Sequence, residues 1–184
     1  EENVSAVVNY PSSKKKDEAK QVIMVTKNGV MKKTPLEDFE NIRRTGIIAI
    51  SLKKGDALKW VRLSSGNDEV ILATRGGQSI RFKESRVRPM SRAAAGIRAI
   101  RLKKGDGVAG FDIIKKEGQQ STVNSQQSKL LLVVMANGFA KKTDLKEYKV
   151  QNRGGSGIKT AKITPKTGQL IAAQVITDQA ELFA

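Results

Sequence analysis

The sequence predicts an all-β protein, an incomplete array of propeller-like β-pinwheel blades with four short strands each. Two observations lead to this prediction. A pattern of short, β-branched strands occurs three times along the chain, and each copy carries a glycine turn at the same place, at Gly29, Gly77 and Gly138. One four-stranded blade cannot bury its own face, so neighbouring blades are required. The two ends match only parts of a repeat, which is why we expect an incomplete array.

The repeats divide the chain into five parts. We expect the end of a preceding blade plus a linker in 1–20, blades in 21–68, 69–129 and 130–178, and the start of a following blade in 179–184. The second blade is longer because it contains 115–129, a polar stretch rich in Gln and Ser that predicts a surface loop.

Within a unit, the elements follow one another in a fixed order. The first unit begins with the apolar strand 22–26, and Asn28-Gly29 predicts a tight two-residue hairpin turn to the second strand. The stretch 35–42 starts with Pro35 and predicts one helical turn. Gly46 then opens a third strand over 47–52, and the turn 53–56 leads to the fourth.

The charge balance points to a polyanionic partner. The 184 residues include 34 Lys+Arg against 18 Asp+Glu, for a formal charge of +16 and a pI near 10.2. Such an excess attracts nucleic acid at long range and releases its condensed counterions. A basic surface that serves only solubility is the alternative.

Several classes of chemistry are excluded by composition. The sequence contains no Cys and no His, which removes disulfides, thiol nucleophiles, Ser-His-Asp triads and metal sites built on these residues. We therefore expect no catalytic residue, no bound metal and no cofactor in this chain. Neither a signal peptide nor a membrane span is recognisable, so we expect a cytoplasmic protein with no membrane partner.

Basic residues recur at equivalent positions of the units and are our candidates for phosphate contact. Lys33, Arg81 and Lys142 each lie four residues after a turn glycine, and Lys32 and Lys141 precede two of them. A second group precedes the third strand of each unit: Arg43, Arg44, Arg86, Arg88, Arg92 and Arg153. Arginine forks suit phosphate oxygens, although lysines on strands also serve simply to prevent edge-to-edge pairing.

Two other interpretations of these segments are weaker. Aromatic residues are only 4% of the chain, which favours contact with a duplex backbone over base stacking. The stretch 153-RGGSGIKT-160 lacks the spacing of a phosphate-binding P-loop. Tyr148 occupies the position of Phe39 in the first unit, so we expect a packing aromatic rather than a nucleophile.

Four segments of the sequence resemble the C-terminal β-pinwheel domain of DNA gyrase A: NGVMKKTPLEDF, RRTGIIAISLKKGD, DEVILATRGGQSIRFKESRVRPM and GIRAIRLKKGD. The corresponding domain of topoisomerase IV is the close relative. The resemblance covers nearly the whole chain and implies the middle blades of a disc in which neighbours exchange one strand. The glycine-rich loop resembles a degenerate copy of the family's gyrase box, made of Gln151, Asn152, Arg153, Gly154, Gly155, Ser156 and Gly157.

The resemblance implies a non-catalytic module that binds, bends and wraps double-stranded DNA to support supercoiling. Its parent would be an ATP-dependent type IIA topoisomerase whose catalytic residues, ATP and Mg²⁺ belong to other domains or subunits. By the same likeness, we expect gyrase B as a partner in a heterotetramer, a monomeric module, and a place at the bacterial nucleoid. The alternatives are the corresponding module of topoisomerase IV and a basic scaffold that binds acidic proteins.

Overall fold

The fold is that of a computed structural model of the chain, which describes residues 6–8, 20–42, 44–116 and 129–177. The described residues form eleven β-strands and three short 3-10 helices, and this confirms the all-β prediction. The 3-10 helices are η2 (Leu36–Phe39), η3 (Glu84–Arg86) and η4 (Leu145–Glu147). The first of them lies within the predicted helical turn of 35–42.

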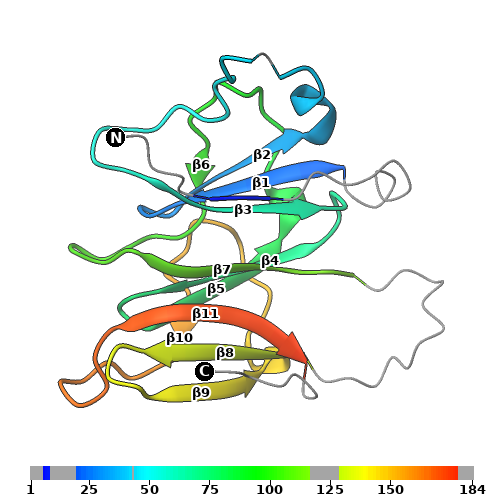
Figure 1. The fold of residues 1–184 in the computed structure, drawn as a ribbon. Helices are drawn as coiled ribbons and strands as arrows, with labels where there is room; N and C mark the ends of the chain where they lie inside the picture. Colours follow the sequence, from blue (N-terminus) through cyan, green and yellow to red (C-terminus); the bar gives the residue numbers. More distant parts are fainter. Residues whose placement is uncertain (1–5, 9–19, 43, 117–128, 178–184) are drawn as a thin grey trace.

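Three antiparallel sheets stack along the chain (Figure 1). The first has the order β3 (Leu58–Ser64), β1 (Gln21–Thr26), β2 (Val30–Pro35), β6 (Ile97–Arg98). The second has the order β10 (Ile158–Lys159), β5 (Gln78–Lys83), β4 (Glu69–Thr74), β7 (Val108–Ile114). The third has three strands, β11 (Leu170–Thr177), β8 (Lys129–Met135) and β9 (Ala140–Asp144).

Each complete sheet takes its fourth strand from the next unit. Strand β6 belongs to the second unit by sequence, yet it pairs with β2, and β10 of the third unit pairs with β5. We call the equivalent segments of the three units the exchange arms: 46–52, 96–102 and 157–163; the second and third of them make this contact. The arms of the second and third units therefore tie each blade to the blade before it.

The hairpin turns differ in detail from the prediction. The φ of Gly29 is +76°, but Asn28 does not have a positive φ, and Gly29 N donates to Thr26 O at 3.1 Å. The connection is thus a type I turn followed by a left-handed glycine, rather than a two-residue turn. Gly77 and Gly138 repeat the device with φ of +77° and +82°.

The expected third strand over 47–52 is not a strand in the structure. The equivalent residues of the next unit form β6 because they lie against β2 of the preceding blade. No described strand precedes the first unit, so its arm has no edge with which to pair.

Apolar residues from adjacent sheets form the core. Ile23 and Val25 of β1 pack with Ile80 and Phe82 of β5 between the first two sheets. A second cluster joins β4 to β8 and β11, and a third covers the outer face of β1. Tyr148 is buried in the second cluster, as expected for a packing aromatic. Since β1 buries both of its faces, its apolar residues run continuously instead of alternating with polar ones.

Candidate nucleic-acid interface

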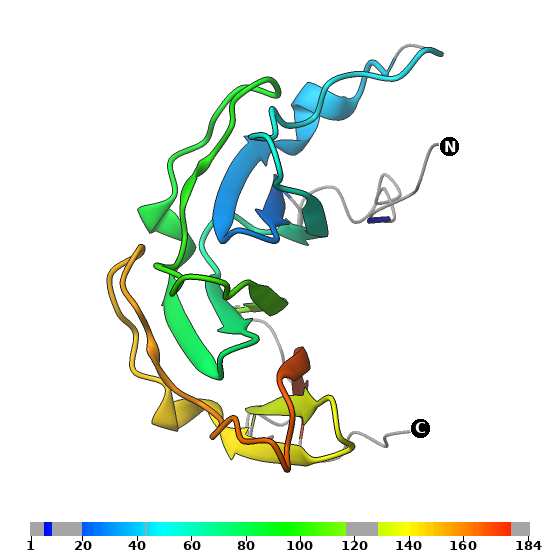
Figure 2. The ribbon, with the colours of Figure 1, turned by 90° about the vertical axis from the view of Figure 1, so that its left-hand side faces the viewer.

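The segments between the 3-10 helices and the ends of the arms lie on the outer, convex side of the array, whereas β3, β7 and β11 lie on its inner side (Figure 2). We call 84–102 and 145–163 the crossover segments. Backbone hydrogen bonds fix them to the previous blade: Ala99 N donates to Gly29 O at 2.8 Å, and Thr160 N donates to Gly77 O at 2.9 Å. The convex side is thus a continuous backbone surface that spans the junctions between blades.

The glycine-rich loop 151–157 is part of this backbone surface. Gly154 N donates to Ala99 O at 2.7 Å, and Arg101 N donates to Gly155 O at 2.8 Å, so the loop pairs with the arm of the second unit. A Cβ on Gly157 would lie 2.3 Å from Ser79 O, and its φ is +73°. Only glycine fits where the chain crosses the neighbouring strand. The glycines of the loop therefore have a packing role in the fold.

Arg153 makes contacts within this surface. Its Nε donates to Arg86 O at 3.3 Å, and its Nη1 donates to Arg98 O. The side chain is half-buried and connects the loop to η3 and to the arm of the second unit. These two bonds hold its guanidinium beside the exposed arginines of the outer side.

Lys33 is buried between the first two blades and does not reach the outer surface. Its Nζ lies 3.5 Å from Glu84 Oε1 and donates to Glu84 O at 3.4 Å. Ser64 Oγ and Asp68 N complete the carboxylate's partners, at 2.9 and 3.3 Å. Lys33 thus acts as a contact between blades, and it is not part of the exposed outer surface.

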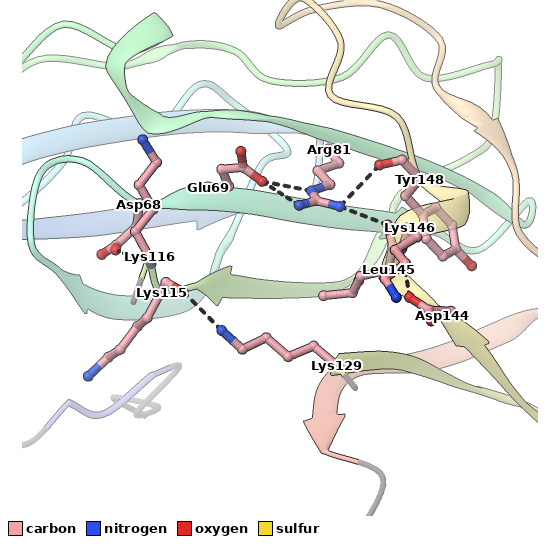
Figure 3. Close-up of polar contacts among 10 residues, drawn as sticks. All are labelled: Asp68, Glu69, Arg81, Lys115, Lys116, Lys129, Asp144, Leu145, Lys146 and Tyr148. Atoms are coloured by element: carbon pink, nitrogen blue, oxygen red, sulfur yellow. Dashed lines mark hydrogen bonds and ion pairs between the residues drawn. The ribbon is translucent and has the colours of Figure 1, made fainter. Parts of the chain in front are cut away.

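Arg81 has the same role at the next junction (Figure 3). Its Nε donates to Glu69 Oε2 at 2.8 Å, and its Nη1 donates to the carbonyls of Leu145 and Tyr148 at 2.7 and 3.3 Å. These carbonyls lie at η4 of the following blade. Because every direction of its guanidinium fork faces the protein, Arg81 is also excluded from the candidate surface.

Lys32 is fully buried and connects two crossing segments. Its Nζ donates to Ala49 O and to Arg92 O. Burial lowers the pKa of Lys32 to about 8, with Asp38 opposing the shift and Arg92 adding to it. Lys32 is therefore a third cation that the sequence placed among the DNA contacts and that the fold buries.

The other sequence candidates have mixed positions. Arg44, Arg86, Arg88, Lys141 and Lys142 are exposed. Arg92 is half-buried, and its Nη1 donates to Asp38 O at 3.1 Å. Arg43 lies outside the described residues. Lys142 is the repeat equivalent of Lys33 and Arg81, and it is exposed because no described blade follows β9.

Seven exposed cations beside these positions were missed from the sequence: Lys83, Arg98, Arg101, Lys146, Lys149, Lys159 and Lys162. A signal for four of them existed. Arg98 and Arg101 lie two and five residues after Gly96, and Lys159 and Lys162 lie two and five residues after Gly157. We call the exposed cations of the crossover segments the outer cationic edge: Arg86, Arg88, Arg98, Arg101, Lys146, Lys149, Lys159 and Lys162.

A hollow of about 410 Å³ interrupts this edge between the second and third units. Lys83, Arg86, Val150, Gln151 and Asn152 line it. Two cations and two side-chain amides at an open depression provide donors for an anion. The hollow thus offers hydrogen-bond donors to an anionic group on the outer side.

The described ranges contain neither a candidate metal site nor a candidate membrane-spanning helix. They contain no group of three or more Asp or Glu residues arranged to hold a metal ion. Across the same ranges, no helix has the length and apolar character needed to cross a membrane.

Residues 20–65, 68–115 and 130–177 match the family described as DNA gyrase C-terminal domain, beta-propeller. The chain is 38% identical over 162 residues to DNA gyrase A of Staphylococcus epidermidis, and 39% identical over the same length to that of Staphylococcus aureus. These alignments cover 88% of this chain but only 17% of each relative.

Solved structures show the same architecture. The C-terminal domain of DNA topoisomerase IV matches with a TM-score of 0.74 and 26% identity, over 86% of this chain and 46% of that one. The DNA gyrase A C-terminal domain matches in fold with a TM-score of 0.72 and 23% identity, over 87% of this chain and 50% of that one. The chain therefore belongs to the family of DNA gyrase C-terminal β-propeller domains.

Proposed function

We propose that this chain is a DNA-binding module of a type IIA topoisomerase, most closely that of gyrase A, and that it bends duplex DNA around its convex side. The observation that carries the proposal is the outer cationic edge. Eight exposed cations lie on two crossover segments, which run along one side of the array. The family and the net charge of +16 support the same partner.

The arrangement suits the phosphate backbone rather than the bases. The edge is made of extended segments and 3-10 turns, so it offers no long helix to enter a major groove. Arginine and lysine side chains along a curved surface hold a duplex by its phosphates, and binding is then tolerant of sequence. A duplex that follows the curve of the edge must bend, which is the role we propose.

The wider assignment follows from the same relatives. We propose that strand cleavage and ATP hydrolysis, with their ATP and Mg²⁺, take place on other domains or subunits of the parent enzyme. Gyrase B would be the partner in a heterotetramer, and the bacterial cytoplasm, at the nucleoid, would be the location. The work of this chain is to hold and direct a DNA segment toward strand passage.

The test is a fluorescence anisotropy titration of a duplex of about 40 base pairs across a salt series. If about six phosphates are neutralised, log K falls with log salt at a slope of roughly −5. Replacing Arg98 and Arg101 by Glu removes two of these contacts, so the slope becomes shallower by about two and the affinity falls for all sequences alike.

The matched control is Lys59→Glu with Lys115→Glu, which changes the net charge equally. Lys59 is exposed on β3, and exposed Lys115 directly follows β7. Both strands run along the inner side of the array (Figure 2). Equal losses in the two double variants would contradict an interface on the outer edge. Binding to heparin without binding to duplex DNA would support the scaffold for acidic proteins.

A further inference from the structure

The turns that follow the first two exchange arms carry cations that are not part of the outer cationic edge. Residues 53–56 and 103–106 both have the sequence Lys-Lys-Gly-Asp, and they lead from an arm to β3 and to β7. In each, the Asp N–H donates to the carbonyl of the first lysine, at 3.0 and 3.1 Å, and the glycine has a φ of +79°. Both are therefore type II turns, and both lysines of each turn are exposed.

The aspartates of these turns fasten them to the hairpin of the same blade. Asp56 accepts hydrogen bonds from Thr26 Oγ1 at 2.7 Å and from Asn28 N at 3.0 Å. Asp106 accepts from Gly76 N, the repeat equivalent of Asn28 N, at 2.9 Å. The two carboxylates thus bind groups of the protein itself, and the lysines beside them are held at fixed positions on the surface.

The third unit fastens its turn to its hairpin with the roles exchanged. Here the hairpin supplies the side chain: Asn137 Nδ2 donates to the carbonyls of Pro165 and Lys166, both at 3.0 Å. Lys166 is exposed, and its Nζ lies 5.7 Å from the centre of the Phe139 ring. All three blades therefore present a lysine on a turn that is tied to their own hairpin.

The three turns lie at one end of the array, on the left in Figure 1, and this end faces the viewer in Figure 2. We call 53–56, 103–106 and 164–168 the turn end; its exposed lysines are Lys53, Lys54, Lys103, Lys104 and Lys166. The described carboxylates gather at the opposite end, where β2, β5 and β9 finish: Glu37, Asp38, Glu40, Asp68, Glu69, Glu84, Asp144 and Glu147. Cations of the opposite end lie among carboxylates, whereas the lysines of the turn end have only two bonded aspartates beside them.

We propose that the duplex runs along the corner where the convex side meets the turn end, and that the lysines of the turn end are phosphate contacts. This inference rests on the proposed function and places the duplex on the molecule. Each arm leads directly into its turn, so Arg101 is followed two residues later by Lys103, and Lys162 is followed four residues later by Lys166. The arm cations and the turn lysines form two adjacent rows, which suit the two phosphate strands beside one groove.

The charges of the two ends favour this path over one along the middle of the convex side or nearer the 3-10 helices. A duplex displaced toward the opposite end would pass the exposed carboxylates of Glu37 and Glu147, which repel phosphate groups. Lysine ammonium groups are point charges on flexible stems, so they follow a phosphate backbone without reading the bases. The turn end thus adds affinity and leaves binding tolerant of sequence.

The test compares two pairs of exposed lysines that flank the same strand, β7. Lys103→Gln with Lys104→Gln neutralises the turn end, and Lys115→Gln with Lys116→Gln removes equal charge at the other end of the strand. In the salt-series titration we expect the first double variant to have a slope shallower by about two and an affinity lower by about tenfold in 0.1 M salt, roughly, and the second to keep the wild-type slope.

Each other outcome has a definite meaning. Equal changes in both double variants, or an unchanged slope in the first, overturn the path along the turn end, while a loss on replacing Arg98 and Arg101 would still support the proposed function. A wild-type chain that binds no duplex overturns both.

Photocrosslinking gives a second measurement that does not depend on net charge. Because the sequence contains no cysteine, a single introduced cysteine carries the crosslinker at one defined position. Lys54→Cys, Lys104→Cys and Lys166→Cys are expected to crosslink a bound duplex, and Lys116→Cys is the control at the opposite end. Crosslinking from position 116 that equals or exceeds that from the turn end also overturns the proposal.

Discussion

Equivalent cations have different roles in this array because neighbouring blades cover some of them and not others. Lys33 contacts the carboxylate and a carbonyl of an adjacent blade, and Arg81 contacts carbonyls of an adjacent blade and Glu69 of its own, while Lys142 is exposed. A buried ammonium group needs such partners, since leaving water without them is costly. Repetition along the sequence therefore identifies equivalent residues but does not determine whether each one is buried or exposed to solvent.

The buried pair of Lys33 and Glu84 gives a stability prediction. Lys33→Met leaves the Glu84 carboxylate without its cation and is expected to lower the free energy of unfolding by about 3 kcal/mol. Adding Glu84→Leu, the residue type that the third unit has at this position, should restore a large part of that loss. Urea unfolding of the single and double variants measures both effects. Strictly additive losses would show that the two side chains do not interact.

Lys32 gives a prediction for pH. Its pKa in the folded chain is about 8, below the ordinary 10.5, so the unfolded state binds more protons between these values. The stability contributed by this group therefore increases as pH rises from about 8 to about 10.5, and the Lys32→Met variant lacks this increase. The chain has no His, which keeps the lower part of this range free of imidazole titration.

The measurement is the difference in free energy of unfolding between wild type and Lys32→Met at several pH values. Lys104→Met, at an exposed turn, is the control and should run parallel to the wild type. A constant difference between wild type and Lys32→Met would show that burial does not perturb this amine.

The exchange arms decide how the elements assemble. An arm of seven residues contributes only two residues to a strand, yet it covers the hairpin glycine of the previous blade and pairs with the loop of the next unit. The glycines at which the arms cross cannot carry a side chain, because a strand carbonyl lies where a Cβ would be. The close packing at a junction therefore depends on a glycine, which has no Cβ at the point where the arm crosses the strand.

Gly157→Ala is expected to lower the free energy of unfolding by at least about 3 kcal/mol, since the added methyl group overlaps Ser79 O and φ is positive. Gly105→Ala, with a φ of +79° and no atom within 4 Å, should cost about 1 kcal/mol from strain alone. Thermal and urea unfolding of both variants test the contrast. Similar losses would mean that the second β-sheet shifts to accept the methyl group.

Local features of the elements could be predicted from sequence, and contacts between blades could not. The left-handed glycines at 29, 77 and 138 and the helical turn after Pro35 depend on nearby residues, and they occur as expected. The third strand over 47–52 depends on a partner edge, so the same pattern forms a strand at 97–98 and none at 47–52.

The candidate site was harder to predict for the same reason. A strand with one buried face would place Lys32 and Lys33 on opposite sides, one of them in solvent. Here both faces of β2 are covered, and both side chains are buried. The arm cations at 98, 101, 159 and 162 carried a readable spacing after their glycines. That all four lie on segments of the convex side could be seen only from the folded structure.

The whole molecule combines a curved array with a large excess of positive charge. The inner strands lie on one side of the array and the crossover segments lie on the other (Figure 2). The crossover segments carry exposed arginines and lysines. A formal charge of +16 on 184 residues makes the folded chain repel itself. Anything that neutralises the outer side, including a bound duplex, should therefore also stabilise the fold.

This self-repulsion predicts that salt stabilises the free chain. Raising NaCl from about 0.05 to about 0.3 M should increase the midpoint of thermal unfolding by a few degrees, because surface charges are then screened. The variant with Arg98→Glu and Arg101→Glu has less charge and should show a smaller increase. Calorimetry at several salt concentrations measures this, and a decrease with salt would show that surface ion pairs dominate instead.

The arm-to-edge contact also bears on how such arrays change during evolution. One junction design joins successive blades, so in-frame recombination at equivalent glycines adds or removes a whole unit and leaves an arm facing an edge again. The buried cations restrict which recombinants survive. Without the second unit, Lys33 would face Leu145 in place of Glu84, an ammonium group without its carboxylate. The backbone thus permits changes in blade number, whereas an unpaired buried cation at a junction destabilises some of the recombinants.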